Sequence, residues 1–265
     1  MGGSLTRSGL DRFDAVAAGH VADDRVPGLV ALVARGDEVH EVVLGSRSIG
    51  GPPVTRDSLF RISSMSKPIT GAATLALAEE GLFDLDEPVD RLLPELADRR
   101  VLRRPDGPLD DTVPAARPIT VRHLLTFTLG FGHMGEMFTG GEPWPVMAAT
   151  YSLRLATLEP PCPAGAPEAD AWIAGFASLP LLAQPGERWC YNTGAQVLGV
   201  LLPRAAGMPL DEVFRTRLFR PLGMASTDFW AQAELLPTAY ASDEGGLSVW
   251  DPPDGQWSRP PAFLD

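Results

Sequence analysis

The spacing of apolar residues near the start of the chain predicts a helix followed by a β-hairpin. Between residues 10 and 22, apolar side chains recur at three- and four-residue intervals, which is the period of an amphipathic helix. Two runs rich in branched apolar residues follow at 28–35 and 39–44, and Gly36-Asp37-Glu38 between them has the composition of a hairpin turn. We therefore expect an antiparallel pair of strands directly after the first helix.

A second set of apolar runs begins at residue 58. Residues 58–62 read as a short third strand, and residues 69–78 are apolar nearly all round, which predicts a helix buried on every side. Pro68 indicates that this helix begins close to Ser64, because proline costs little in a first turn, where the backbone amides have no intrahelical acceptors. Gly81 is the expected C-terminal cap.

The pattern in the second half of the chain predicts three further helices. Thr120 is a suitable N-cap for a helix over 121–126. An apolar helix is expected over 195–202, where Pro203 and Gly207 would interrupt or end it. An amphipathic helix is expected over 209–219, because its apolar residues fall on one face.

Residues 131–187 predict a long, loop-rich region, because they are rich in glycine and proline. The same region carries methionine and aromatic side chains, and two interpretations of these are open. They line an apolar substrate pocket, for which Phe131, Met134 and Trp144 are the candidates, or they anchor the loops to the core.

Composition limits the possible partners. A length of 265 residues allows a sizeable buried core, and 45% hydrophobic with 21% charged residues is ordinary for a globular protein. The formal net charge of −12 argues against nucleic acid or an anionic membrane surface as a partner. The oligomeric state is left open.

The two cysteines and four histidines point away from metal chemistry. Cys162 and Cys190 are too few and too far apart for a metal site or a disulfide framework, so we expect free thiols. The histidines show no ligand spacing, and we expect no cofactor. The first residues lack the apolar core of a signal peptide and no run is long enough to span a membrane, so a cytoplasmic location is expected.

Ser64 and Lys67 form the most reactive pair in the sequence. On a helix, residues three apart lie on one face with Cβ atoms roughly 5–6 Å apart, which places a hydroxyl nucleophile beside an amine. Lys67 is the only lysine, since the other 21 of the 22 basic residues are arginine, and only lysine can become neutral when it is desolvated. A serine precedes a lysine at this offset by chance about once in twenty, so the surrounding motifs must decide.

Several motifs in order resemble those of the β-lactamase-related serine hydrolases, the group of class C β-lactamases, DD-peptidases and family VIII esterases. They are the stretch at 59–70 that holds Ser64 and Lys67, the stretch at 121–126, Trp189-Cys190-Tyr191, Leu198-Gly199, and Pro221-Leu222-Gly223-Met224 followed by Thr227-Asp228-Phe229. The resemblance implies a β-lactamase/transpeptidase-like α/β (α+β) fold, in which an antiparallel sheet is flanked by helices and joined to a mostly helical subdomain.

The resemblance also implies roles for individual residues. Ser64 would be the acylated nucleophile, Lys67 its proton acceptor or electrostatic activator, and Tyr191 the second-motif tyrosine that relays the proton. Whether Lys67 or Tyr191 is the general base stays open. Class C enzymes carry Tyr-x-Asn, whereas here the third position is Thr193 and Asn192 comes one residue early, so these two are only candidates for substrate binding.

We expect the third motif of the family to be absent from the end of this chain. It is a K-T-G, H-x-G or W-x-G triad on a central strand that supplies one of two oxyanion-hole amides, and no K-T-G can follow the single lysine. The resemblance therefore implies one incomplete domain over 1–265, with a sheet-side part at about 1–85, a helical and loop-rich part at about 86–230 and a tail at 231–265. We expect weak or no activity from such a truncated chain alone.

Three functions remain open at this point. The leading hypothesis is a serine hydrolase, most simply a carboxylesterase, that cleaves small esters through an acyl-Ser64 intermediate. A β-lactamase or DD-peptidase-like amide hydrolase is the alternative, although such enzymes work outside the cytoplasm. The third is a non-catalytic or fragmentary family member that serves as a binding or assembly module. The expected partner is a small-molecule ester or lactam.

Overall fold

The chain divides into two compact units. A computed structural model describes residues 4–23, 25–139, 142–156, 158, 163, 165–243 and 245–261, and Cys162 lies outside these residues. One unit, here the hairpin unit, is built from residues 1–61 and 230–260. The other, here the helical unit, is built from residues 62–229 and 261–265.

The hairpin unit begins with the predicted helix and hairpin, and both are confirmed. The Thr6 hydroxyl accepts a hydrogen bond from the Gly9 amide and caps the helix. Arg35 pairs with Glu38 at the end of the hairpin, so the turn has two residues, and Gly36 adopts the positive φ of +60° that such a turn favours. The elements of this unit are α1 (Arg7–Ala22), β1 (Gly28–Arg35), β2 (Glu38–Gly45), η6 (Ala233–Leu235), β5 (Ala239–Asp243), β6 (Gly246–Asp251) and η7 (Gln256–Ser258).

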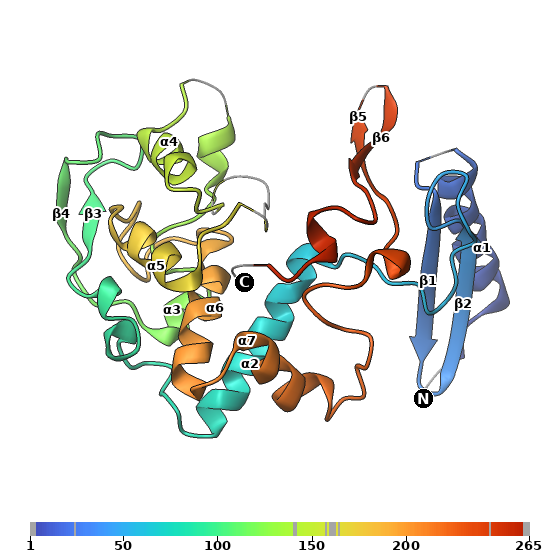
Figure 1. The fold of residues 1–265 in the computed structure, drawn as a ribbon, viewed down its shortest axis with the longest axis horizontal. Helices are drawn as coiled ribbons and strands as arrows, with labels where there is room; N and C mark the ends of the chain where they lie inside the picture. The colour runs from blue at the N-terminus through green and yellow to red at the C-terminus, as the bar shows by residue number, and fades with distance from the viewer. Residues whose placement is uncertain are drawn as a thin grey trace. The chain divides into compact units, whose positions relative to one another are not determined.

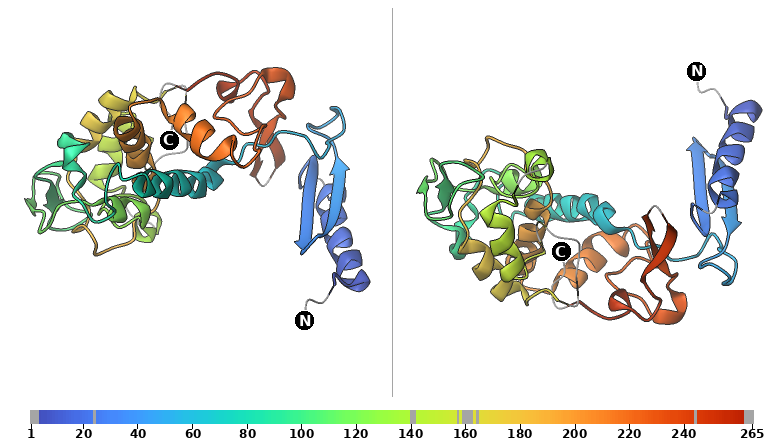
Figure 2. Two further views of the ribbon diagram at one scale, coloured as in Figure 1. Left: turned by 90° about the horizontal axis from the view of Figure 1, so that it is seen from below. Right: turned by 90° about the horizontal axis from the view of Figure 1, so that it is seen from above.

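Helix α1 lies along the hairpin of β1 and β2 (Figure 2). His40 on β2 places its Nε2 atom 2.6 Å from Asp14 Oδ1 on α1, and the Phe13 ring meets the His40 ring edge to face. These contacts hold the helix against the sheet.

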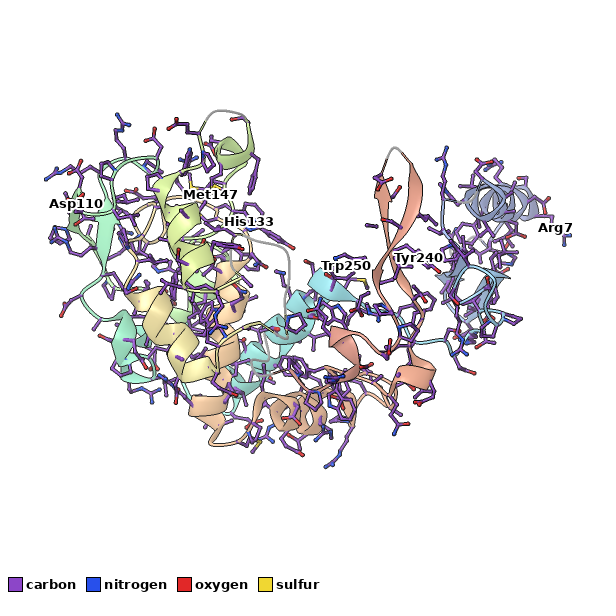
Figure 3. All side chains as sticks on the ribbon, turned by 45° about the horizontal axis from the view of Figure 1, so that its top comes forward. Arg7, Asp110, His133, Met147, Tyr240 and Trp250 are labelled. Atoms are coloured by element: carbon purple, nitrogen blue, oxygen red, sulfur yellow. The ribbon has the colours of Figure 1, made fainter. Side chains whose placement is uncertain are left out.

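The second hairpin, β5–β6, carries Tyr240 and Trp250 (Figure 3). Arg61 is distant from this hairpin in the sequence but contacts it in the fold. Its guanidinium lies 2.7 Å from the buried carboxylate of Asp251 and also donates to the Pro237 carbonyl. The predicted strand at 58–62 is wrong. A strand needs a ladder partner, and each sheet formed by the described residues contains only two strands, none of them from this segment.

Helix α6 is the centre of the helical unit. It packs against α2, α3, α5 and α7 (Figure 1), and its residues 193–202 are all buried. The helical unit contains η1 (Ser63–Met65), α2 (Ser66–Glu79), η2 (Val89–Arg91), η3 (Pro94–Leu96), β3 (Arg100–Leu102), β4 (Thr112–Pro114), α3 (Val121–Leu125), η4 (Gly135–Phe138), α4 (Pro145–Ser152), α5 (Ala169–Ala177), α6 (Thr193–Ala206), α7 (Leu210–Phe214) and the π-helical turn η5 (Arg215–Phe219).

Close helix packing in this unit depends on one glycine. A Cβ atom at Gly194 would lie 2.3 Å from the Leu124 carbonyl oxygen, so α6 approaches α3 at a distance that no other residue allows. The helix ends at Gly207, whose φ is +65°, while Pro203 stays inside it. The helix therefore extends beyond the predicted residues at both ends.

Helix α2 begins and ends where the sequence predicts, but its burial differs. Gly81 follows it with a φ of +78°, as expected of a cap. The prediction of burial on every side is wrong, because Leu75 is 47% exposed and Ala72 is exposed as well. Thr70, Ala73, Thr74 and Leu77 form the single buried face. An apolar pattern records what a helix can bury, whereas the extent of burial depends on its neighbours.

The region 131–187 is more helical than its glycine and proline content predicts, since it contains α4 and α5. Trp172 and Phe176 on α5 are fully buried, and the indole of Trp172 donates to the Leu155 carbonyl. Arg99 closes the end of α5 because its guanidinium donates to the carbonyls of Phe176, Ala177 and Leu179. Burial lowers the pKa of Arg99 to about 10.

The described part of the chain has neither a membrane-spanning helix nor a cluster of metal ligands. No helix among these residues is long and apolar enough to cross a bilayer. Nor do they contain a group of three or more His, Cys, Asp or Glu side chains placed to hold a metal ion.

Candidate active site

Ser64 sits on a tight turn directly before α2. The preceding Ser63 has a φ of +46°, which is uncommon for a residue other than glycine and costs roughly 1–3 kcal/mol. The turn η1 places Ser64 ahead of the helix, where backbone amides have no intrahelical acceptor. Ser64 is exposed, so its hydroxyl is accessible to a ligand.

Lys67 reaches Ser64 as the three-residue spacing predicts. Its Nζ donates a hydrogen bond to Ser64 Oγ over 3.2 Å. Lys67 is half-buried, and its Nζ also lies over the ring of Tyr191, 4.8 Å from the centroid. A nucleophile, a cation and a phenol therefore meet in one place.

Tyr191 is carried to this place by a backbone pairing that joins two distant segments. The His133 amide donates to the Tyr191 carbonyl over 2.8 Å, and the Tyr191 amide donates to the His133 carbonyl over 3.0 Å. His133, labelled in Figure 3, belongs to the segment between α3 and α4. This segment therefore holds the backbone of Tyr191 in place and so positions its ring beside Ser64.

Gly132 allows that pairing, a role that was not predicted from the sequence. Its φ is +142°, and a Cβ atom there would lie 2.3 Å from the Tyr191 carbonyl oxygen and 2.8 Å from that of Cys190. Only glycine permits the two backbones to come so close. The available signal was two glycines spaced two apart, Gly130 and Gly132, immediately after a predicted helix.

The surroundings of Tyr191 favour its ionised form. Hydrogen bonding with Ser64 is the main cause that holds the pKa of the Tyr191 phenol below its usual range, and the positive charge of Lys67 adds to it. Burial acts in the opposite direction but is outweighed. A phenolate at this position would accept a proton from the Ser64 hydroxyl.

We expect Tyr191 to ionise below the usual tyrosine value of about 10. Phenolate absorbance recorded against pH, minus the same curve for Tyr191→Phe, isolates this phenol from the other two of the chain's three tyrosines. Ser64→Ala should move the isolated transition to higher pH, because it removes the main stabilising hydrogen bond. Since a lowered pKa makes phenolate available at lower pH, the acylation rate should rise with pH through the same transition. A transition at or above 10 would contradict the assignment.

An aromatic cluster surrounds the phenol. The rings of Phe127 and Trp189 lie 5.9 and 5.7 Å from that of Tyr191, centroid to centroid, and the His133 ring lies 6.0 Å away. Trp189 is 61% exposed, so part of the cluster faces solvent beside the nucleophile. No role at the site was predicted from the sequence for Phe127, Trp189 or His133.

The remaining candidates occupy other positions. Asn192 stands at the N-cap of α6 with φ +87°, and Thr193 begins the helix and is fully buried. Phe131 is fully buried edge to face with Phe176, and Met134 is buried in the same core. Trp144 is half-buried against this core at the N-cap of α4. Phe131, Met134 and Trp144 thus pack into or against the core, as the anchoring interpretation expects, and the roles of all five residues in substrate binding stay predictions.

Cys190 is a free thiol next to Tyr191, as expected from the sequence, and it is fully buried. Burial raises the pKa of Cys190 to about 11. The thiol is therefore protonated at neutral pH and is a poor nucleophile.

Comparison with known proteins finds relatives along most of the chain. A model of the Beta-lactamase family matches residues 13–262. An uncharacterized protein of Mycobacterium tuberculosis (strain CDC 1551 / Oshkosh) is 36% identical over 243 residues, which are 90% of this chain and 57% of that protein. Esterase EstB of Burkholderia gladioli is 32% identical over 224 residues, 82% of this chain and 51% of that protein.

A solved structure extends the likeness to the fold. EstCE1, described as a hydrolase with promiscuous acyltransferase activity, is 27% identical with a TM-score of 0.74, and the match covers 92% of this chain and 59% of that one. The chain thus spans about half the length of the curated relatives it matches. The fold class inferred from the motifs is confirmed, and so is the resemblance itself. This chain belongs to the β-lactamase family.

Proposed function

We propose that the protein is a serine hydrolase that cleaves small carboxylic esters through an acyl-Ser64 intermediate. One observation carries the proposal, namely that Ser64 interacts with both Lys67 and Tyr191. A serine hydroxyl at its ordinary pKa is a weak nucleophile and needs an adjacent base. The named esterase among the relatives and the hydrolase among the solved structures support the same chemistry.

We assign the role of base to Tyr191 and an electrostatic role to Lys67. Lys67 donates to Ser64 Oγ and lies over the Tyr191 ring, so a protonated amine stabilises both the phenolate and the developing negative charge. As Ser64 Oγ attacks the ester carbonyl carbon, its proton passes to the Tyr191 oxygen. The tetrahedral intermediate then collapses, the C–O bond to the alcohol breaks, and Tyr191 returns the proton to the departing oxygen.

Hydrolysis of the acyl-enzyme repeats these steps with water in place of Ser64. Tyr191 takes a proton from water, the hydroxide oxygen attacks the acyl carbon, and the Ser64 oxygen leaves with the proton from Tyr191. The Ser64 backbone amide, on the turn ahead of α2, is a donor for the oxyanion in both halves. An alkoxide leaves more readily than an amide anion, so an ester makes smaller demands on this machinery than an amide.

The test is formation of the acyl-enzyme, which does not depend on turnover. The chain is mixed with p-nitrophenyl acetate or butanoate, and the release of p-nitrophenolate is followed together with the intact mass. Because only the Ser64 amide is assigned to the oxyanion, we expect slow release of p-nitrophenolate, up to one equivalent per chain, with an acyl adduct on Ser64 and little turnover beyond it. Ser64→Ala should abolish both, whereas the matched Ser66→Ala should retain them, because Ser66 has no lysine three residues on.

Two outcomes would favour the other functions. Nitrocefin opening as fast as ester cleavage would indicate a β-lactamase. Absence of any adduct at Ser64, with these esters and with a fluorophosphonate probe, would contradict the hydrolase and favour a non-catalytic module.

A further inference from the structure

A cavity lies beside Lys67, in the groove between α2, α3 and α6. It has a volume of about 310 Å³ and is open to solvent on one side, and its wall includes Lys67 and Gly71 of α2, Leu124 and Leu125 of α3, Phe127, and Leu198 of α6. All of these residues belong to the helical unit. The cavity is therefore formed within a single unit.

The cavity suits a hydrocarbon ligand. Most of its wall is aliphatic or aromatic carbon. The Thr70 hydroxyl in the wall already donates to the Ser66 carbonyl over 3.2 Å, and the Lys67 amine donates to Ser64. These two polar groups therefore need no hydrogen bond from a ligand, and contact with apolar surface is enough to stabilise binding.

Gly71 keeps the cavity open. A Cβ atom at this position would meet only Leu125 Cδ2, at 4.0 Å, so a larger side chain would extend into free space. A methylene group takes up roughly the 30 Å³ of one water molecule in the liquid. The cavity therefore has room for a chain of several carbons.

We propose that this cavity is the acyl pocket, which holds the hydrocarbon chain of the acyl group transferred to Ser64. The inference rests on the proposed hydrolase function. The single side chain of Lys67 both lines the cavity and contacts Ser64 Oγ, so a chain attached to Oγ enters the cavity along it. Neither Ser64 nor Tyr191 lines the cavity, so the acyl chain reaches it by passing the Lys67 side chain, while the leaving alcohol stays beside Tyr191.

Acyl-chain length tests this assignment. Rate constants for release of the first equivalent of p-nitrophenolate are measured with acetyl, butanoyl, hexanoyl and octanoyl esters. Each methylene that enters the pocket should raise the rate constant about three- to fourfold until the cavity is full. Gly71→Leu fills the cavity and should lower the ratio of the hexanoyl to the acetyl rate constant by tenfold or more.

Gly19→Leu in the last turn of α1 is the matched control, because it is also a helical glycine and a Cβ atom there meets nothing within 4 Å. It should leave the ratio unchanged. If Gly71→Leu does not fold, Gly71→Ala carries the test with a smaller fall in the ratio, since alanine favours the helix more than glycine does.

The possible outcomes distinguish failure of the acyl pocket from failure of the proposed hydrolase function. A burst with the acetyl ester but no dependence on chain length, or an equal fall for every ester in Gly71→Leu, would overturn the acyl pocket alone. So would a Gly71→Leu effect that follows the length of the alcohol in a series of acetyl esters. Absence of a burst with every ester, acetyl included, would overturn the hydrolase and the acyl pocket together.

Discussion

Lys67→Met is expected to lower the rate constant for acylation of Ser64 by about 10³-fold, within the range that the loss of one preorganised electrostatic contact costs. Methionine keeps the length and the apolar stem of the side chain but removes the donor to Ser64 Oγ and the charge over the Tyr191 ring. The pKa of Tyr191 should then rise toward its usual range, which leaves less phenolate at neutral pH. The measurement is the burst of p-nitrophenolate from an acetyl ester, with the intact mass as a check on the adduct.

Two further variants make this result specific. Arg220→Met removes a positive charge from an exposed position in the same unit and should leave acylation within about twofold of the parent. Lys67→Arg keeps the charge but cannot act as a base, so it should retain more activity than Lys67→Met if Lys67 works electrostatically. Acylation by Lys67→Met within tenfold of the parent rate would contradict the assigned role.

Gly132→Ala is expected to damage both the site and the stability of the helical unit through one added methyl group. Its Cβ atom would lie 2.3 Å from the Tyr191 carbonyl oxygen, and a φ of +142° is rarely adopted by alanine. The backbone pairing of His133 with Tyr191 must then open, and the phenol moves away from Ser64. We expect about a 10²-fold loss in the acylation rate and a loss of about 2–4 kcal/mol in the free energy of unfolding.

Gly135→Ala is the control for this prediction. It lies in the same loop, has no positive φ, and a Cβ atom there meets nothing within 4 Å. Urea unfolding followed by circular dichroism gives the stability, and the p-nitrophenolate burst gives the acylation rate. Equal behaviour of the two alanine variants in both measurements would show that the close approach at Gly132 does not position Tyr191.

Features of the fold that depend on residues close together in the sequence could be predicted from it. The hairpin of β1 and β2 follows from alternating apolar runs around a glycine turn, and the start of α2 follows from Pro68. The strand expected at 58–62 was wrong because strand formation requires a partner that local sequence cannot specify. Helices α4 and α5 were missed because the glycine and proline around them dominate the local pattern.

At the candidate site, too, contacts between residues close in the sequence were predictable and contacts between distant segments were not. The contact of Lys67 with Ser64 follows from helix geometry alone, since both residues lie on one face. The proximity of Tyr191 was inferred only from the order of family motifs, because its position depends on a backbone pairing with His133, far away in the sequence. Periodicity could not place Phe131, because a buried aromatic residue in a core and one in a substrate pocket give the same pattern.

The position of Lys67 over the Tyr191 ring has a spectroscopic consequence. Nuclei that lie over the face of an aromatic ring are shifted upfield by its ring current, and the Lys67 amine lies 4.8 Å from the ring centroid. Because this is the only lysine, isotope-labelled lysine would introduce a single labelled side chain into the whole protein. Its magnetic resonance signal would therefore need no assignment, and its chemical shift would report directly whether the nucleophile, the amine and the phenol are assembled.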